Sequence, residues 1–344
     1  MASAPDRTGR RAPRIRDVAA RAGVGVGTVS RVLNDAPGVA DATRERVRAV
    51  MDELGYRPSS TARNLSLGRT QTLGVVAPFF TSPSVVERLR GIDDVIGASA
   101  YDLTLFNIET LEQRRAALRR FARRTRIDGV IVISLPLTAG EARALGRDGL
   151  PAVLVDVASA ELPHVAIDDV DGGAIATRHL LDAGHRQIAF VGDVKDIEFG
   201  FASSERRLHG FQAALEKAGV ALAPGYVKRG PFGRESASRL ARQLLALRRR
   251  PTAIFAASDV QAFGVLDAAA RVGLAVPEDL SVIGFDDIEL ASAIGLTTVR
   301  QPLRESGQLG AQLLLGVLDG GGGGPPVALP ELAVVRRRTV GPPP

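Results

Sequence analysis

The segment IRDVAARAGVGVGTVSRVLN, residues 15–34, joins two short patterns of helical period through a glycine-rich turn. Over residues 15–22 apolar side chains recur at spacings of three and four, and Gly23 supplies the left-handed residue that ends a helix. A second helix is predicted to run from about Gly25 to Leu33. Two short helices around a tight glycine turn are typical of a helix-turn-helix module.

The stretch DATRERVRAVMDELGY, residues 41–56, predicts a third helix after this pair. Asp41 is expected to be its N-cap, and Gly55 is expected to end it. Its apolar stripe consists of Val47, Val50, Met51 and Leu54. The sequence therefore predicts a small all-helical module over residues 14–57.

The glycines of residues 23–27 suggest a second interpretation, a loop that binds a dinucleotide phosphate. That fingerprint requires G-x-G-x-x-G directly after a strand. Here the sixth position is Thr28, the preceding segment is helical, and no acidic residue ends a second strand further on. The dinucleotide interpretation therefore fails. Gly27 is then predicted to lie inside a helix, where glycine lowers helix stability by roughly 1 kcal/mol relative to alanine. We interpret this unfavourable residue as a sign that DNA approaches the helix closely at this position.

The formal charge of +6 lies at one end of the chain. Residues 1–70 contain 13 arginines and 7 acidic residues, whereas basic and acidic residues cancel in the remainder. Arginine pairs with phosphate oxygens through two hydrogen bonds, and each neutralised phosphate releases counterions. The Arg-rich module therefore predicts a polyanionic partner, and residues 1–13 are expected to form a disordered basic tail.

After a polar linker at residues 58–70, the pattern changes to alternating strands and helices. The strand-like segments are QTLGVVAP, YDLTLFNI, GVIVIS, AVLVDV, HVAID, QIAFVGD, TAIFAAS and LSVIGFDD. Several are continuous apolar runs, which are typical of a parallel sheet covered on both faces. The stretch DGGGGGPP at 319–326 is expected to be a surface loop. This alternation over about 260 residues predicts an α/β core of two doubly wound sheets.

Composition excludes several classes of protein. No run of about 18 uncharged apolar residues occurs, and the Arg-rich start lacks the apolar centre of a secretion signal. We therefore expect a cytoplasmic protein without a membrane partner. Cysteine is absent, which excludes disulfides and thiolate chemistry. His179 and His185 lack the spacing that aims two imidazoles at one metal, so we expect solvated or capping histidines and no metal or other cofactor.

Two pairs of neighbouring carboxylates, Asp168–Asp169 and Asp286–Asp287, raise the question of acid–base catalysis. Neighbours in a strand or turn point to opposite sides, however, and no Ser/His/Asp order accompanies them. The sequence therefore predicts a protein that is not an enzyme. A binding protein that never touches DNA is a further alternative, but such proteins are exported and lack an Arg-rich helical module.

The segment at residues 15–34 and the following VADATRERVRAVMDELGYRPSSTARNLSLGRTQTLGVVAP resemble the lactose-repressor (LacI/GalR) family of bacterial transcription regulators. The likeness continues through RRLHGF, SDVQAFGV, SVIGFDD and TTVRQP. It implies an N-terminal all-α helix-turn-helix headpiece, a hinge, and an α/β periplasmic-binding-protein-like core of two doubly wound parallel-sheet subdomains. It also implies a homodimer or tetramer on pseudo-palindromic double-stranded operator DNA. No further heptad follows Val340, so we expect no additional tetramerising helix.

The resemblance also implies boundaries along the chain. We expect a tail at 1–13, the headpiece at 14–57, the hinge at 58–70, the core at 71–340 and a tail at 341–344. Within the core, we expect an N-subdomain at about 71–169 and 301–328, and a C-subdomain at about 170–300 and 329–340.

DNA contacts follow from the matching positions of the second helix. The expected base-reading residues are Val26, Gly27 and Arg31, and the expected phosphate contacts are Thr28, Ser30 and Asn34. Arg31 can donate two hydrogen bonds to a guanine, whereas Val26 offers apolar contact to a thymine methyl.

The hinge is expected to order on the operator and to insert a leucine into the minor groove. Leu65 matches that leucine, with Ala62 and Arg63 beside it. Two residues of the headpiece depart from the family pattern. Arg14 stands where a capping Thr or Ser is common, and Gly25 stands where Ser is common.

An effector site is implied between the two core subdomains, where strand ends converge. The candidate contacts are Phe79, Phe80, Ser134, Asp156, Arg207, Phe232, Ser258, Asp259, Asp286 and Gln301. Carboxylates and arginines bind hydroxyl groups, and phenylalanine faces stack on the apolar side of a sugar ring. We therefore predict a repressor of carbohydrate-utilisation genes that a sugar-like effector releases from its operator. A regulator that responds to a purine or another corepressor is the alternative.

Overall fold

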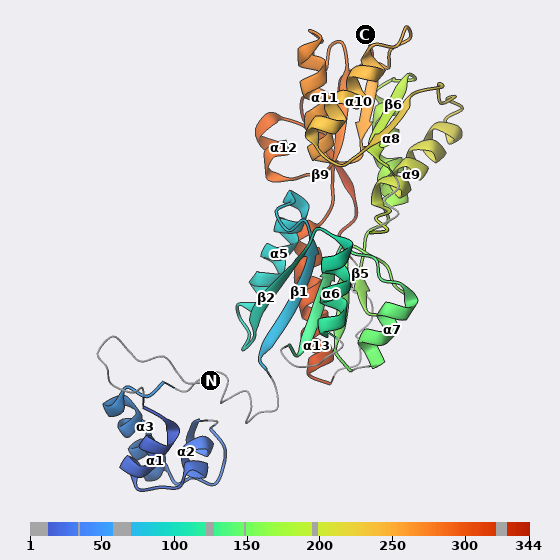
Figure 1. Cartoon of the computed structure of the whole chain (residues 1–344). Helices are drawn as coiled ribbons and strands as arrows, with labels where there is room; N and C mark the ends of the chain where they lie inside the picture. Colours follow the sequence, from blue (N-terminus) through green and yellow to red (C-terminus); the bar gives the residue numbers. More distant parts are fainter. Residues whose placement is uncertain are drawn as a thin grey trace. The chain divides into compact units, whose positions relative to one another are not determined.

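The computed structural model describes residues 13–33, 35–57, 70–121, 127–147, 149–194, 199–320 and 329–344 (Figure 1). It divides into a helical unit, Met1–Gln71, and an α/β unit, Thr72–Pro344. The residues predicted to contact DNA that lie outside the described ranges are Asn34, Ala62, Arg63 and Leu65. Most of the N-terminal tail, of the linker and of the glycine-rich stretch also lies outside them. No helix in the described ranges is long and apolar enough to cross a membrane.

The helical unit confirms the predicted helix-turn-helix arrangement. Its described helices are α1 (Ile15–Ala22), α2 (Val26–Leu33) and α3 (Asp41–Leu54). Gly23 and Gly55 end α1 and α3 in the left-handed conformation, with φ of 66° and 61°. The three helices bury one apolar cluster, which consists of Val18, Ala19, Ala22, Val29, Val32, Val47 and Val50.

The start of α3 differs from the sequence expectation, whereas α1 has its N-cap at Arg14, where a cap was expected. Ala40 is the N-cap of α3, and Asp41 is the first residue inside the helix, so the predicted Asp41 cap is wrong. An acidic side chain in the first turn still interacts favourably with the helix dipole, which explains why this residue type marks the start. At α1 the N-cap is Arg14, whose backbone N–H donates to the Asp17 carboxylate at 2.7 Å. Asp17 therefore compensates for the missing Thr or Ser.

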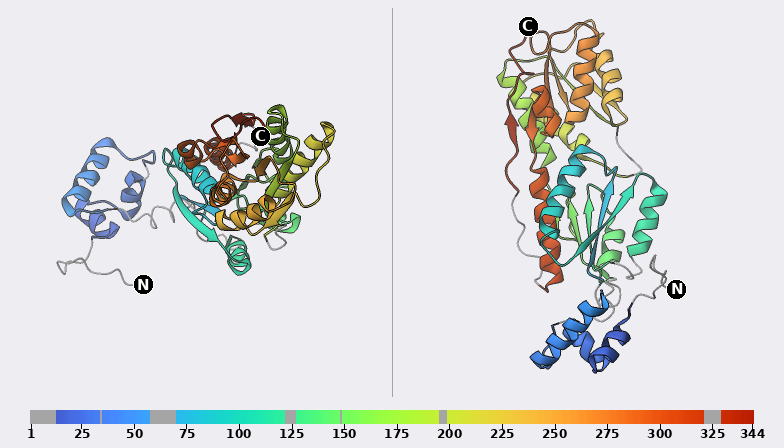
Figure 2. Two further views of the ribbon diagram at one scale, coloured as in Figure 1. Left: turned by 90° about the horizontal axis from the view of Figure 1, so that it is seen from above. Right: turned by 90° about the vertical axis from the view of Figure 1, so that its left-hand side faces the viewer.

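The first lobe of the α/β unit is a parallel sheet of the order β2-β1-β3-β4-β5. Its strands are β1 (Thr72–Pro78), β2 (Asp102–Ile108), β3 (Gly129–Ile133), β4 (Ala152–Val155) and β5 (His164–Val165). α5 (Pro83–Ile96) and α13 (Leu303–Leu318) cover one face, and α6 (Leu111–Phe121) and α7 (Ala139–Arg147) cover the other (Figure 2). Because both faces are covered, the central strands β1, β3 and β4 are buried almost throughout.

The second lobe contains a sheet of the order β11-β10-β9-β8-β6-β7, in which β10 and β11 pair antiparallel and the other pairs are parallel. Its strands are β6 (Ile188–Asp193), β7 (Val227–Gly230), β8 (Ala253–Ala256), β9 (Ser281–Asp286), β10 (Thr297–Arg300) and β11 (Ala333–Val335). One face packs against α8 (Asp169–Asp182) and α9 (Ser203–Lys217), and the other against α10 (Arg234–Leu245), α11 (Asp259–Arg271) and α12 (Glu289–Ile294). Two doubly wound sheets confirm the predicted fold class.

The chain passes between the lobes three times, between β5 and α8, between β10 and α13, and between α13 and β11. α13 therefore belongs to the first lobe, although it follows most of the second lobe in the sequence. Its residues Ala311 and Leu314 pack with Ile92 of α5 and Val75 of β1. Figure 1 shows α13 beside the first sheet.

His185 is buried, so the prediction that it is solvated or capping is wrong. Its Nδ1 lies 2.9 Å from Thr252 Oγ1, and its Nε2 lies 3.0 Å from the carbonyl oxygen of Gly341. The imidazole therefore holds the C-terminal segment against the second sheet. His179 is half-buried on α8, where its carbonyl accepts a hydrogen bond from the N–H of Ala183.

Candidate DNA-binding and effector sites

One face of α2 carries the predicted DNA contacts that the structure describes. Val26, Gly27 and Arg31 are exposed on it, and Thr28 and Ser30 are partly exposed. The opposite face of the helix is buried in the apolar cluster of the helical unit. The fold therefore leaves the predicted contact residues accessible to a partner.

Gly27 occupies an open position inside α2. A Cβ atom at this position would meet no heavy atom within 4 Å, and the same is true of Gly25. Gly25 is the N-cap, since its carbonyl accepts from the N–H groups of Thr28 and Val29 at 2.9 and 3.2 Å. The described contacts of the helical unit therefore do not require glycine at position 27, which fits a close approach by an external partner.

The ion pairs of the helical unit use other arginines and leave Arg31 available. Arg44 and Arg48 donate to the same carboxylate oxygen of Asp35, at 3.1 and 2.9 Å. Arg21 pairs with Glu53 at 2.6 Å. The Arg31 side chain makes no hydrogen bond or ion pair with any described residue.

Several predicted effector residues hold the backbone at strand ends in the left-handed conformation. The φ angles are 46° at Phe79, 50° at Ser134, 70° at Asp156 and 126° at Asp286. Such conformations cost a non-glycine residue roughly 1 kcal/mol or more, and they concentrate at functional sites. The strain therefore marks the carboxyl ends of β1, β3, β4 and β9 as a candidate binding site.

A chain of polar side chains connects these strand ends. We call it the strand-end cluster, and its members are Ser134, Asp156, Arg88, Gln301, Asp286, Arg207 and Asp169. Ser134 Oγ donates to Asp156 Oδ2 at 2.7 Å, and Arg88 Nη2 donates to Asp156 Oδ1 at 2.5 Å. Arg88 Nη2 also donates to Gln301 Oε1 at 3.0 Å, and Gln301 Nε2 donates to Asp286 Oδ1 at 2.5 Å. Because Asp156 follows β4 and Asp286 ends β9, the cluster links the two lobes.

Arg207 is the buried cation on the second-lobe side of the cluster. Its Nε donates to Asp169 Oδ1 at 2.9 Å, and its Nη1 donates to the carbonyl of Ala257 at 2.6 Å. The same Nη1 lies 3.8 Å from Asp286 Oδ1, and the guanidinium carbon lies 3.7 Å from the ring centroid of Phe285. Arg207 is thereby fixed by paired charge and by its contact with an aromatic face.

Burial raises the pKa of the carboxyl groups around Arg207. For Asp286 burial raises the pKa to about 6, although Arg207 and the hydrogen bond from Gln301 oppose the rise. Asp193, at the end of β6, also has its pKa raised to about 6 by burial, against the charge of Arg207 and the hydrogen bond from Gln261. The pKa of Asp169 is raised by burial as well. Carboxyls that titrate near neutral pH can accept or donate hydrogen bonds to a polar ligand.

Ser258 and Asp259 do not present free ligand groups, although both were predicted as effector contacts. Ser258 is the N-cap of α11, and its Oγ accepts from the N–H of Gln261 at 3.2 Å. Asp259 is fully buried, and its two oxygens accept from Ile288 N at 3.0 Å and from Thr298 Oγ1 at 2.5 Å. Both residues therefore fix the ends of α11, β9 and β10 rather than point to a ligand.

The three predicted aromatic contacts have accessible faces. Phe79 is 45% exposed, Phe80 is 38% exposed and Phe232 is 55% exposed. Phe79 and Phe80 follow β1, whereas Phe232 lies between β7 and α10. Exposed aromatic faces beside buried polar groups suit a ligand with one apolar and one polar side.

Sequence reasoning missed several residues of this region, namely Arg88, Asp169, Asp193 and Gln261. Asp193 lies in the predicted strand QIAFVGD, so its strand-end position was visible in the sequence. Gln261 lies one turn into α11, and its Nε2 donates to Asp193 Oδ1 at 2.7 Å. Arg88 gave no such signal, because an arginine in the helical segment VVERLRG is typical of a solvated face.

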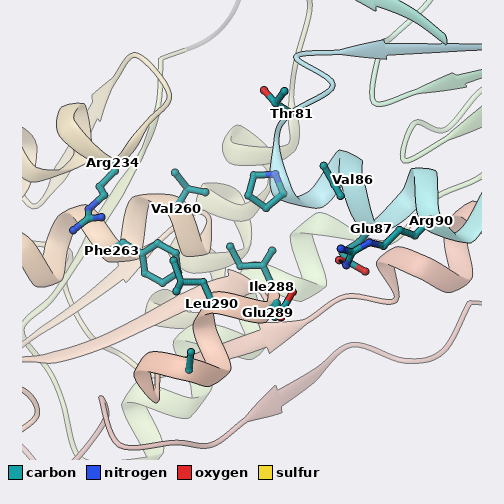
Figure 3. Close-up of a pocket in the computed structure, with 12 residues that line it drawn as sticks. Thr81, Val86, Glu87, Arg90, Arg234, Val260, Phe263, Ile288, Glu289 and Leu290 are labelled. Carbon is teal, nitrogen blue, oxygen red and sulfur yellow. Dashed lines mark hydrogen bonds and ion pairs between the residues drawn. The ribbon is translucent and has the colours of Figure 1, made fainter.

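A cavity of about 570 Å³ lies elsewhere on the α/β unit (Figure 3). The start of α5 forms one wall, and α10, α11 and α12 contribute the other. Its lining is mainly apolar and contains none of the ten predicted effector residues. The polar groups and the strained backbone occur at the strand ends, whereas this cavity is lined mainly by apolar side chains.

A helix-turn-helix unit followed by a two-lobed α/β unit with a polar cluster at its strand ends defines a DNA-binding regulator with a sensor core. Residues 14–59 match the family described as bacterial regulatory proteins, lacI family, and residues 177–340 match a periplasmic binding protein-like domain. The chain belongs to the LacI family of bacterial regulators.

Curated relatives and solved structures are similar to this chain over most of its length. The HTH-type transcriptional repressor PurR of Photobacterium profundum is 35% identical, with 88% of this chain and 90% of that protein covered. The ribose operon repressor of Escherichia coli K12 is also 35% identical, with 88% and 92% covered. The lac repressor dimer bound to operator and the anti-inducer ONPF superposes with a TM-score of 0.82 at 29% identity, with 96% and 100% covered.

Membership of the LacI family establishes the general function of the chain. The chain is a LacI-family transcriptional repressor with a DNA-binding headpiece, and it is not an enzyme. This confirms the predicted family, the predicted fold class and the prediction that the paired aspartates do not mark a catalytic site.

Proposed function

We propose that this repressor controls carbohydrate-utilisation genes and leaves its operator when a sugar-like molecule binds between the lobes. The observation that carries the proposal is the strand-end cluster, in which carboxylates, an amide and two arginines meet, together with the exposed phenylalanines that follow β1 and β7. Hydroxyl groups of a sugar can replace or extend these hydrogen bonds, and its apolar face can stack on Phe79 or Phe232. Solved relatives with cellobiose and with ribose bound support this ligand class.

On the DNA side, we propose that α2 enters the major groove. Arg31 then donates to a guanine, Val26 contacts an apolar base edge, and Gly27 allows the helix to approach closely. Thr28 and Ser30 bind phosphates beside them. The hinge contacts proposed for Ala62, Arg63 and Leu65, and the phosphate contact of Asn34, rest on the sequence resemblance.

A homodimer fits both the operator and the surface of the α/β unit. The apolar cavity of Figure 3 is lined by Val86, Val260, Phe263 and Ile288, with Leu290 49% exposed at its edge. A second copy would cover this surface and place two headpieces on the half-sites of a pseudo-palindrome. The solved dimer of the lac repressor supports this assembly.

A purine-type corepressor is the second candidate. Five of the curated relatives at 33–35% identity are named PurR, and flat aromatic bases also stack on phenylalanine. The two candidate ligands change operator affinity in opposite directions, because an inducer weakens operator binding and a corepressor strengthens it.

The test is a gel-shift titration of the full chain on DNA from upstream of its own gene, at low and high salt. Ribose, cellobiose and hypoxanthine are then added in turn. Release by a sugar supports the proposal, whereas tighter binding with hypoxanthine replaces it by the corepressor function. Because the two binding equilibria are linked, operator DNA must change the affinity for the active compound by the same factor by which that compound changes operator affinity. The corresponding coupling free energy is typically 1–3 kcal/mol. Failure to bind any such fragment would remove the DNA-binding part of the proposal.

A further inference from the structure

Arg88 is an unusual residue on the buried face of α5. That face otherwise consists of Val85, Gly91, Ile92 and Ile96, which pack toward the first sheet and α13. The Arg88 side chain is 3% exposed, so its charge is almost completely removed from water. Burial of an arginine is costly unless its hydrogen bonds and its charge are well paired.

The partners of Arg88 come from its own helix and from two distant parts of the chain. Its Nη2 donates to Asp156 after β4 at 2.5 Å and to Gln301 after β10 at 3.0 Å, and its Nη1 lies 3.3 Å from the carbonyl of Ser84. Its Nε is buried without a hydrogen-bond partner among the described residues. The pairing is therefore incomplete, so stability alone does not account for this arginine.

Arg88 determines how Gln301 is oriented. A guanidinium can only donate, so the amide oxygen of Gln301 must face it and the amide nitrogen must face the other way. That nitrogen meets Asp286 Oδ1 at 2.5 Å. Arg88 and Asp286 favour the same orientation of the amide, because an amide oxygen turned toward Asp286 would oppose the carboxylate, and loss of Arg88 leaves the amide oxygen without its donor.

Arg88 fixes Asp156 in the same way. One carboxylate oxygen of Asp156 accepts from Arg88 and the other accepts from Ser134 at 2.7 Å. One guanidinium nitrogen thus sets a side chain of the first lobe and, through Gln301, a side chain of the second. Lysine can reproduce this arrangement only in part, because both bonds use Nη2, whose direction is fixed by the planar guanidinium, whereas an ammonium lies on a flexible stem.

We propose that Arg88 is a positioning residue of the effector site, which holds Asp156 and Asp286 in one register across the two lobes before a ligand enters. The effect on effector binding rests on the proposed function, whereas the effect on the arrangement of the two lobes does not. Arg88 acts through Gln301 and Asp156 and not by contact with the ligand. Its loss should therefore loosen the relation between the lobes and weaken effector binding together.

The chain contains no cysteine, which allows a direct test of the geometric part. Arg115 on α6 and Glu216 on α9 are exposed, lie in different lobes, and are replaced by cysteine for spin labelling. Distance distributions are measured in the full-length chain, in Arg88→Met and in Arg88→Lys. The control is Arg304→Met, which removes a two-bond ion pair with Asp94 at 2.6 and 2.7 Å inside the first lobe.

We expect Arg88→Met to broaden the distance distribution between the lobes, Arg88→Lys to restore it in part, and Arg304→Met to leave it unchanged. Gln301→Met is the second variant should Arg88→Met not fold, since it keeps the Arg88–Asp156 pair and breaks the link to Asp286. When Gln301→Met is combined with Arg88→Met, the distance distribution should broaden little further, because both substitutions interrupt the same chain of contacts. A distribution that is unaltered in both Arg88→Met and Gln301→Met overturns the proposal.

Ribose and cellobiose are the ligand probes, and binding is measured by calorimetry. Where the parent chain binds either sugar, we expect the affinity of Arg88→Met to fall about tenfold or more, with Arg304→Met unaffected. Equal affinity in parent and Arg88→Met contradicts the positioning role. Should neither sugar bind the parent chain, the sugar-effector function fails, and the distance measurement still decides the role of Arg88.

Discussion

Arg207, whose side chain is buried, meets two carboxylates, a carbonyl and an aromatic ring of the second lobe. Removal of one partner of a buried ion pair leaves the other charge unpaired, which typically costs 3–5 kcal/mol. We predict that Arg207→Met lowers the free energy of unfolding of the α/β unit by about 3 kcal/mol, measured by urea denaturation.

Arg178 provides the matched control for this prediction. It pairs with Asp171 at 3.4 Å, and both side chains are more than half exposed. Exposed pairs contribute between about 0 and 1 kcal/mol, so Arg178→Met should leave the urea midpoint nearly unchanged. Equal effects of the two substitutions would show that burial of Arg207 does not stabilise the lobe.

Asp193 makes the stability of the second lobe depend on pH. Burial raises its pKa from 3.8 to about 6 in the folded protein, so the folded state holds a proton that the unfolded state has released. Stability from this group is therefore complete below about pH 4 and is lost as the pH rises through 6. In the parent chain this loss lowers the free energy of unfolding by about 2 kcal/mol between pH 4.5 and 7. We predict that this decline is absent in Asp193→Asn.

Urea unfolding at several pH values measures this effect. Asparagine keeps an oxygen that can accept from Gln261, so the variant changes the charge with little change in contacts. The control is Asp182→Asn on the exposed surface of α8, which should leave the pH profile as it is. A profile for Asp193→Asn that matches the parent chain would contradict the assignment.

At the residue scale, motifs and strand ends revealed part of the candidate site. Arg207 and Asp286 lie in RRLHGF and SVIGFDD, and the structure brings both into one cluster. Arg88 and His185 escaped prediction, because burial of a polar side chain depends on partners far away in sequence. Asp259 was predicted at the right strand end, but its two oxygens turn inward to Ile288 and Thr298.

At the scale of the element, α2 combines an open glycine with the candidate DNA face. We predict that Gly27→Ala raises the free energy of unfolding by up to about 1 kcal/mol, since alanine favours helix and no neighbour obstructs its Cβ. Operator affinity should fall nevertheless, because the added methyl group stands between the helix and the groove. Thermal unfolding and gel-shift titration measure the two effects.

Gly316 in α13 is the matched control for Gly27. It is a helical glycine whose added Cβ would also meet nothing within 4 Å, and it lies in the α/β unit. Gly316→Ala should stabilise the chain similarly and leave operator affinity alone. Unchanged operator affinity in Gly27→Ala would refute the close approach of DNA at this residue.

Strands that lie in apolar runs were predictable, whereas β7, β10 and β11 were not. β3 and β4 consist of buried aliphatic residues and were recognised in the sequence. β7 carries Lys228 and Arg229, and β10 and β11 have four and three residues. Such strands form because neighbouring strands supply the hydrogen bonds, so their own composition gives a weak signal.

At the scale of the whole molecule, the apolar surface of Figure 3 should decide assembly. We predict that Leu290→Glu raises the dissociation constant of the dimer at least about tenfold, because it introduces a charge into a desolvated contact. Operator affinity should fall with it, since two headpieces are needed for two half-sites. Sedimentation equilibrium and gel shift follow the two quantities.

Val272 is the control for this surface. It is 51% exposed, close to the 49% of Leu290, and it lies at the far end of α11 outside the cavity lining. Val272→Glu should leave the dimer intact. A dimer that also survives Leu290→Glu would place the interface elsewhere.

The alternation of apolar strands with amphipathic helices was sufficient to predict two doubly wound sheets. It did not by itself assign α13 to the first lobe, because its sequence follows the strands of the second lobe, and that placement was expected only from the family resemblance, as residues 301–328 of the N-subdomain. The assignment depends on packing of Ala311 and Leu314 with Ile92 and Val75, which adjacency along the chain does not reveal.

This interleaved path has a consequence for biosynthesis. A ribosome delivers all strands of the first sheet early, together with α5, yet α13, which shares the cover of one face with α5, emerges only with residues 303–318. The nascent first sheet must therefore wait with the face of Leu73, Ile131 and Val153 only partly covered. The second lobe, whose strands β6 to β10 are continuous in the chain, can mature sooner. Chaperones that shield apolar surface during translation would accordingly be needed most by the half that is made first.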